Sequence, residues 1–145
     1  MTMPNSGTTN VQPYLFFNGR CEEALNFYRD AVGADVQIMM RFGDSPEPIP
    51  GAQPGSENKV MHATCRIGQT SFMASDGKCE GAPKFEGFSL AISVPNESDA
   101  DRMFNGLAQG GKIEMPMMKT FWAPKFGMLE DRFGVGWMVS VEHKP

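Results

Sequence analysis

The chain of 145 residues is long enough for one compact domain, or for two small modules that share a core. Hydrophobic residues make up 41% of it and charged residues 21%, which is an ordinary globular composition and excludes a disordered chain. The formal net charge of −4, without a cluster of Lys and Arg, argues against a protein that binds nucleic acid through its phosphates.

Three features of the sequence favour a cytoplasmic protein that does not enter a membrane. No apolar run approaches the roughly 18 residues that a membrane span needs. Residues 1–10 lack the basic start and the apolar core of a signal peptide, and we expect them to form a disordered tail. The three cysteines, Cys21, Cys65 and Cys79, include no C-x-x-C pair, which argues against a disulfide framework or a zinc site and fits a reducing compartment.

The first half of the chain predicts a strand, a helix and three further strands. The helix is expected over 21–32, where apolar residues recur at a spacing of three and four, and Gly33 follows as its stop. Residues 43–58 hold four prolines and three glycines, so we expect a long loop of the kind that often serves as a lid or a partner contact. The strands are expected at 11–18, about 36–42, 60–67 and 70–75.

The same order of elements returns in the second half. The helix is expected over 96–109, with Asn96 or Ser98 as its cap and Gly110-Gly111 at its end. The closing hairpin turns at Asp131-Arg132-Phe133-Gly134, because glycine takes a positive φ without a Cβ penalty. The strands are expected at 87–95, 112–118, 126–130 and 137–141.

Two successive strand–helix–three-strand units, each of about 70 residues, indicate an internal duplication. We therefore expect one module at residues 11–76, a linker at 77–86 and a second module at 87–143. Together they would make one compact domain.

Several segments of the sequence resemble the PhnB-like branch of the vicinal oxygen chelate superfamily. This superfamily contains glyoxalases, bleomycin-resistance proteins and extradiol dioxygenases. The resemblance runs from Val11 to Glu142 and is carried by PYLFFNGRCEEALNFY, HATCRIG, FMASDG, NGLAQGGKIEMP, KTFWAPKFG and DRFGVGWMVSV. It implies an α+β fold in which two βαβββ modules form a curved eight-stranded sheet, with helices outside and a concave face inside. It also implies a homodimer, because members commonly pair modules across a two-fold axis.

The usual metal site of that superfamily is not supported by the residues at the matching positions. In glyoxalase-like members, His, Gln or Glu side chains from four strands bind the metal. The corresponding residues here are Pro13, Phe72 or Met73, Ser89 and Met138. They cannot supply three or four nitrogen or oxygen ligands, and the chain has only two histidines, His62 and His143. We therefore expect neither a metal nor another cofactor.

A cleft on the concave face is then expected to bind a small molecule. Its mixed apolar and hydroxyl lining would suit a small amphipathic or aromatic ligand, although the same residues could simply close the core. The opposite alternation, with Tyr14, Phe16, Trp137 and Val139, would pack beneath the helices. The expected lining residues are Leu15, Phe17, Ser89, Ala91, Ser93, Met138 and Ser140.

Four further side chains are candidates for a role in the cleft. His62 could act as an acid, a base or a ligand anchor, or could be a hydrogen-bonded structural residue. Asp76 reads equally well as a turn residue, and Glu114 as a solvated strand residue or a general base. Trp122, with Lys119 and Phe121 nearby, could grip a planar ligand or a partner subunit.

The motifs that the sequence lacks limit the classes of function that it can have. The sequence has no Gly-rich turn between a strand and a helix, which argues against the methyltransferase label that related sequences sometimes carry. It also lacks a G-x-S-x-G elbow and a Cys with a neighbouring His. Sequestering a ligand needs only an apolar cleft and a dimer, whereas catalysis needs polar groups that converge on one point. Binding is therefore favoured over a metal-free isomerase or lyase, and both over a metal-dependent glyoxalase or dioxygenase.

Overall fold

The computed structural model describes residues 9–77 and 81–142. The N-terminal unit contains β1 (Tyr14–Phe16), α1 (Cys21–Val32), β2 (Asp35–Arg41), the short 3-10 helix η1 (Phe42–Asp44), β3 (Val60–Ile67) and β4 (Thr70–Ser75). The C-terminal unit contains β5 (Leu90–Val94), α2 (Glu97–Ala108), β6 (Lys112–Met118), β7 (Phe126–Glu130) and β8 (Gly136–Val141). Most of the expected tail, together with Cys79 and His143, lies outside the described residues.

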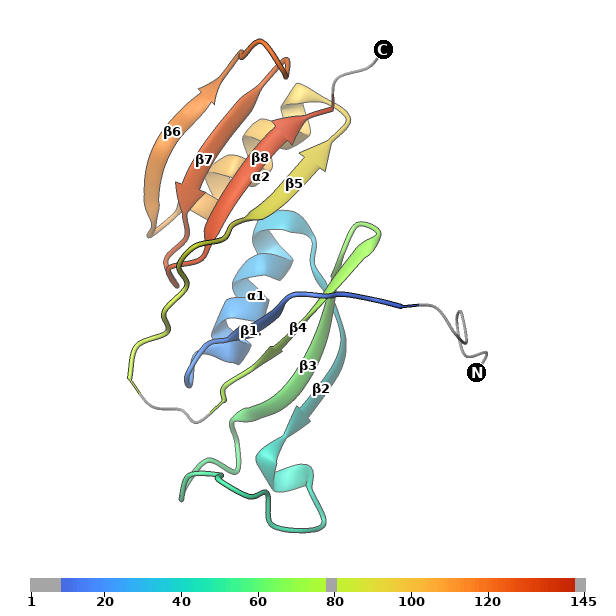
Figure 1. Cartoon of the computed structure of the whole chain (residues 1–145), viewed down its shortest axis with the longest axis vertical. Coiled ribbons are helices and arrows are strands. Elements are labelled where there is room, and N and C mark those ends of the chain that lie inside the picture. Colours follow the sequence, from blue (N-terminus) through green and yellow to red (C-terminus); the bar gives the residue numbers. More distant parts are fainter. Residues whose placement is uncertain (1–8, 78–80, 143–145) are drawn as a thin grey trace.

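The strands form two four-stranded mixed sheets with the same topology (Figure 1). The order is β1-β4-β3-β2 in the N-terminal unit and β5-β8-β7-β6 in the C-terminal unit. In each unit the first strand runs parallel to the last, and the other pairs are antiparallel. The predicted α+β fold of two βαβββ units is confirmed. Within the described residues, the eight strands are divided between two separate sheets.

Both helices form where the apolar spacing predicts them. α1 buries one stripe of side chains and ends at Gly33, whose φ of 70° lets its N–H reach the carbonyl of Arg29. α2 begins at Asn96, whose side chain accepts a hydrogen bond of 2.8 Å from the backbone N–H of Asp99. Neither helix is long and apolar enough to cross a membrane.

The two units share one core on the helix side of their sheets. α1 and α2 approach closely at Gly106, where a Cβ would lie only 3.2 Å from the Cα of Ala31. Phe133, in the turn between β7 and β8, packs against the rings of Phe17 and Tyr28 of the N-terminal unit.

A buried carboxylate joins the units as well. Asp131 of the C-terminal unit is 3% exposed and accepts a hydrogen bond of 2.5 Å from the hydroxyl of Tyr28. The indole N–H of Trp137 and the backbone N–H groups of Phe133 and Val135 donate to the same carboxylate. Burial and the nearby Asp131 carboxylate raise the pKa of Tyr28 well above its ordinary value, so its hydroxyl stays protonated.

Candidate functional site

Within residues 9–77 and 81–142, each sheet has one face covered by a helix and one open face. On the N-terminal sheet, the open face is set by the register of β2 and β3, which places Ile38 opposite Thr64 and Met40 opposite His62. Tyr14 and Phe16 of β1 share this face. Four of its apolar side chains are between 39% and 50% exposed, namely Tyr14, Phe16, Ile38 and Met40.

The alternation expected for the first strand is wrong by one residue. Leu15 is 2% exposed and Phe17 is fully buried, so both lie in the shared core and cannot line an open cleft. Phe17 instead packs against Tyr28 of α1, with ring centroids 6.2 Å apart. The error arises because the segment YLFF is apolar on both alternations, so its pattern does not determine which face is buried.

On the C-terminal sheet the open face has the alternation that the sequence predicts. Trp137 and Val139 are buried on the helix side, while Met138 and Ser140 are partly exposed on the other. Across the parallel pair of β5 and β8, Ser93 lies 3.4 Å from Ser140, hydroxyl to hydroxyl. Ala91 is exposed on the same face, and Ser89 is exposed just before β5, beside Gly136.

An aromatic group continues this open face at the start of β7. Phe126 lies opposite Ser140 and therefore faces the same side. Trp122 is 50% exposed and packs against Phe126, with ring centroids 5.3 Å apart. Phe121, at 96% exposure, stands edge-on to Trp122. Phe121 and Trp122 thus lie beside the C-terminal sheet.

The most organised polar group on the N-terminal open face is built around His62. Its Nδ1 lies 3.1 Å from the hydroxyl of Tyr14, and its Nε2 lies 3.4 Å from the hydroxyl of Thr64. The rings of Tyr14 and Phe16 are stacked 4.9 Å apart. We call these four residues the Tyr14–His62 cluster. It gives His62 defined partners on both ring nitrogens, which the sequence alone did not indicate.

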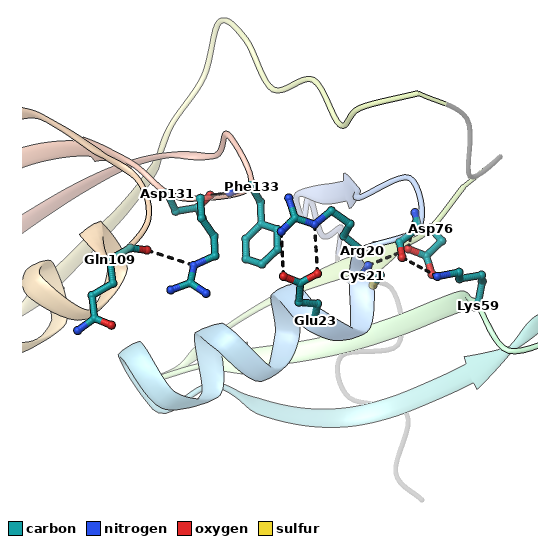
Figure 2. A network of polar contacts seen from close by, with 10 residues as sticks. Arg20, Cys21, Glu23, Lys59, Asp76, Gln109, Asp131 and Phe133 are labelled. Atoms are coloured by element: carbon teal, nitrogen blue, oxygen red, sulfur yellow. Dashed lines mark hydrogen bonds and ion pairs between the residues drawn. The ribbon is translucent and has the colours of Figure 1, made fainter.

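Asp76 is not part of this cluster and is a buried structural group. It is 1% exposed, and its Oδ1 accepts hydrogen bonds of 2.8 Å from the backbone N–H groups of Gly19 and Cys21 (Figure 2). Its Oδ2 accepts another from the N–H of Val60. The carboxylate therefore caps α1, whose own Arg20 supplies no side-chain cap. The structure favours the turn-residue interpretation of Asp76 over catalysis.

Glu114 is exposed on β6, an edge strand of the C-terminal sheet. The three candidate catalytic residues therefore occupy three different places: the N-terminal open face, the start of α1 and the C-terminal sheet edge. Within this one chain they do not converge on one point.

The described residues do not fit the metal site of the fold. Phe72 is buried in the core, while Met73 and Met138 place thioethers on the open faces, where a hard divalent ion would need nitrogen or oxygen. Pro13 and Ser89 precede β1 and β5. Among residues 9–77 and 81–142, no three His, Cys, Asp or Glu side chains are grouped to hold a metal.

Two of the cysteines are buried free thiols. Burial raises the pKa of Cys65 to about 11, and raises the pKa of Cys21 still further. A thiolate is the reactive form of cysteine, so these two thiols are structural rather than catalytic.

The buried thiols predict that stability falls in alkali. A thiol whose pKa rises on folding stabilises the fold fully below about pH 8.5, and this contribution is lost as the pH rises towards 11. We expect urea unfolding to give a lower free energy at about pH 10 than at about pH 7.5. In the double variant Cys21→Ala, Cys65→Ala the decrease should be smaller, and an identical decrease would contradict this assignment.

Comparison with known proteins identifies the family. The model of a family described as 3-demethylubiquinone-9 3-methyltransferase matches residues 9–140. The chain belongs to this family. A solved structure from Bacillus cereus, a putative 3-demethylubiquinone-9 3-methyltransferase and PhnB protein, is 31% identical with a TM-score of 0.77, covering 92% of this chain and all of that one. The expected PhnB-like membership is confirmed.

Other known proteins are similar over almost their whole length. Protein PA1353 from Pseudomonas aeruginosa is 41% identical with a TM-score of 0.80, covering 94% of this chain and all of that one. Protein YjdN of Escherichia coli K12 is 36% identical over 138 residues, which are 90% of this chain and 94% of YjdN. A glyoxylase/bleomycin resistance protein/dioxygenase domain from Frankia sp. EAN1pec covers 95% of this chain and 98% of its own, with a TM-score of 0.63, and at 15% identity it shows the shared fold alone.

Proposed function

We propose that two copies of this PhnB-like chain pair their open sheet faces and bind a small, partly aromatic molecule in the cleft between them, without a metal. The observation that carries the proposal is the pair of open faces, which hold half-exposed aromatic and Met side chains. Soluble proteins seldom leave contiguous apolar patches of this kind uncovered unless they bind something there. Met side chains adapt to varied ligand shapes, and aromatic rings stack on flat ones.

A second copy is needed because one chain cannot close its own cleft. Its two units are joined through their helix sides, by α1 against α2 and by the Tyr28–Asp131 hydrogen bond. The open faces therefore point away from the shared core, and bringing them together within the chain would break those buried contacts. Pairing with another chain supplies the missing wall. The buried free thiols Cys21 and Cys65 fit a reducing cytoplasm for this dimer.

Ligand binding is supported better than methyl transfer, the activity in the family's description. The glycines after α2 do not form a phosphate-binding turn, because they follow a helix and lead into a strand. Gly110 has a φ of 75°, and Gly111 packs tightly against the backbone at Glu130 and Asp131. These glycines turn the chain and allow close packing.

The proposal predicts a dimer that is stabilised by flat aromatic compounds. Gel filtration with light scattering should show a dimer at micromolar concentration, and a monomer would contradict the cleft. In a thermal-shift screen, a compound at 100 times its Kd should stabilise the fold by about 2.7 kcal/mol, which raises Tm by several degrees. Trp122→Ala should weaken binding by roughly fivefold, because an aromatic contact is lost. Val11→Ala, an exposed residue before β1, is the matched control and should change nothing.

The fate of the compound separates binding from catalysis. A bound compound that is recovered unchanged after long incubation, with and without S-adenosylmethionine, supports sequestration. Conversion of the compound that persists in EDTA, and that is lost in His62→Ala while binding remains, would replace the proposal by a metal-free enzyme. Methylation in the presence of S-adenosylmethionine would replace it by a methyltransferase.

A further inference from the structure

The hydroxyl of Tyr14 has a defined hydrogen-bond partner on the N-terminal open face. The side chain is 39% exposed, and its hydroxyl lies 3.1 Å from Nδ1 of His62. The other nitrogen of His62 is held by Thr64, so the imidazole is fixed at both ends. Because β1 and β3 are both hydrogen-bonded to β4, the two residues lie on one face although 48 positions separate them in sequence.

The direction of these hydrogen bonds depends on the tautomer of His62, because the Tyr14 hydroxyl can both donate and accept. Partial burial raises the pKa of Tyr14, so its hydroxyl is protonated at neutral pH. A neutral imidazole has one donor and one acceptor nitrogen. If Tyr14 donates to Nδ1, then Nε2–H donates to the hydroxyl of Thr64. The side chain of Ser75 is a further hydrogen-bond partner of the phenolic oxygen of Tyr14, which keeps one lone pair to accept a hydrogen bond from a ligand.

The rings beside this oxygen form a flat, uncharged platform. Phe16 is stacked on Tyr14 at 4.9 Å, with an angle of 18° between the ring planes. The Phe16 ring also lies against Gly77, where a Cβ would come within 3.1 Å of its Cδ1. Met40, opposite His62, and Met73, opposite Tyr14, complete the surroundings with thioethers. Such a lining favours an uncharged planar ring over an ion.

We propose that Tyr14 is the polar anchor of the ligand site, and that the ligand is an uncharged aromatic compound bearing a hydroxyl or N–H donor. This inference rests on the proposed function and specifies its ligand class. The donor binds the Tyr14 oxygen while the ring stacks on the platform of Tyr14 and Phe16. His62 and Thr64 are positioning residues, because they orient the Tyr14 hydroxyl without contacting the ligand themselves.

Two probes of almost the same shape test the anchor. 2-Naphthol carries the donor, and 2-fluoronaphthalene has a fluorine atom in its place and cannot donate. Fluorescence titration of the wild-type dimer at about pH 8 should show 2-naphthol binding roughly fivefold more tightly, the usual effect of one hydrogen bond. Tyr14→Phe keeps the ring and removes the oxygen. It should abolish the preference and leave the affinity for 2-fluoronaphthalene within about twofold.

Substitutions at the neighbouring residues test the positioning role. His62→Ala should reduce the preference for 2-naphthol, and His62→Asn should partly restore it, because the Asn side-chain oxygen can replace Nδ1 as the acceptor. Phe16→Leu should weaken both probes equally, since the platform serves both. A preference that survives in Tyr14→Phe would overturn the anchor. Equal affinities of the two probes for the wild type would also overturn it, while leaving the aromatic cleft in place. If neither probe binds the wild type, both the proposed aromatic cleft and the proposed Tyr14 anchor are contradicted.

Discussion

Replacing Asp131 with Ala is expected to lower the free energy of unfolding by about 4 kcal/mol. The carboxylate is buried and accepts hydrogen bonds from four donors, the Tyr28 hydroxyl, the Trp137 indole and two backbone N–H groups. Removing it leaves all four without a partner in a site that water does not reach, and each unpaired buried donor costs about 1–3 kcal/mol before relaxation. It also removes the hydrogen bond that joins the two units.

Urea unfolding followed by Trp fluorescence measures this effect. Tyr28→Phe keeps the ring and removes only one of the four donors, so it should cost about 1 kcal/mol. Glu130→Ala, at the partly exposed neighbouring position, is the control and should stay within about 0.5 kcal/mol. A loss below about 1 kcal/mol for Asp131→Ala would mean that the network does not stabilise the fold as described.

Gly111→Ala should destabilise the protein by about 3 kcal/mol, or prevent it from folding. A Cβ at this position would collide with the carbonyl oxygen of Glu130 and lie 2.9 Å from the Cα of Asp131. Both neighbours are backbone at the end of β7, so neither can rotate away as a side chain could. Gly111 is required because of this close packing. Its φ is not positive, so its backbone conformation does not itself demand a glycine.

The matched control separates crowding from backbone conformation. Gly51 has a φ of 82° and nothing within 4 Å of the position that a Cβ would take. Gly51→Ala should therefore cost only the left-handed strain, about 1 kcal/mol. Equal losses for the two variants in urea unfolding would show that the close approach at Gly111 can relax.

Local sequence patterns were sufficient to predict the helices and strands of this fold. The three-and-four spacing of apolar residues and the stop at Gly33 predict α1 over the residues where it is found. The alternation in β8 predicts which of its side chains are buried, because polar and apolar residues differ clearly there. The first strand carries no such contrast, so its pattern does not show that Leu15 and Phe17, rather than Tyr14 and Phe16, are the buried residues. A phenolic tip on Tyr14 was the one available signal that this ring stays partly exposed.

The site could not be predicted because it depends on pairing between distant strands. Tyr14 meets His62 only through the order β1-β4-β3, which no local pattern encodes. The same is true of Asp131, which reads as a turn residue until Tyr28 of the other unit is placed beside it. Asp76 likewise lies at a turn and is buried, and its carboxylate accepts hydrogen bonds from three backbone N–H groups. In each case the sequence shows the chemistry of the residue but does not show which residue it contacts.

The hydrogen bond between Tyr28 and Asp131 also sets an order of events during synthesis. The acceptor follows the donor by 103 residues, so at ordinary translation rates the Tyr28 hydroxyl is made roughly 5–20 s before the carboxylate exists. The strands of the N-terminal unit can all pair once Ser75 has left the ribosome. The face of α1 that will meet α2 and Phe133 is still bare at that moment. During synthesis, the Tyr28 hydroxyl of the N-terminal unit therefore lacks its buried acceptor until the last hairpin has been made.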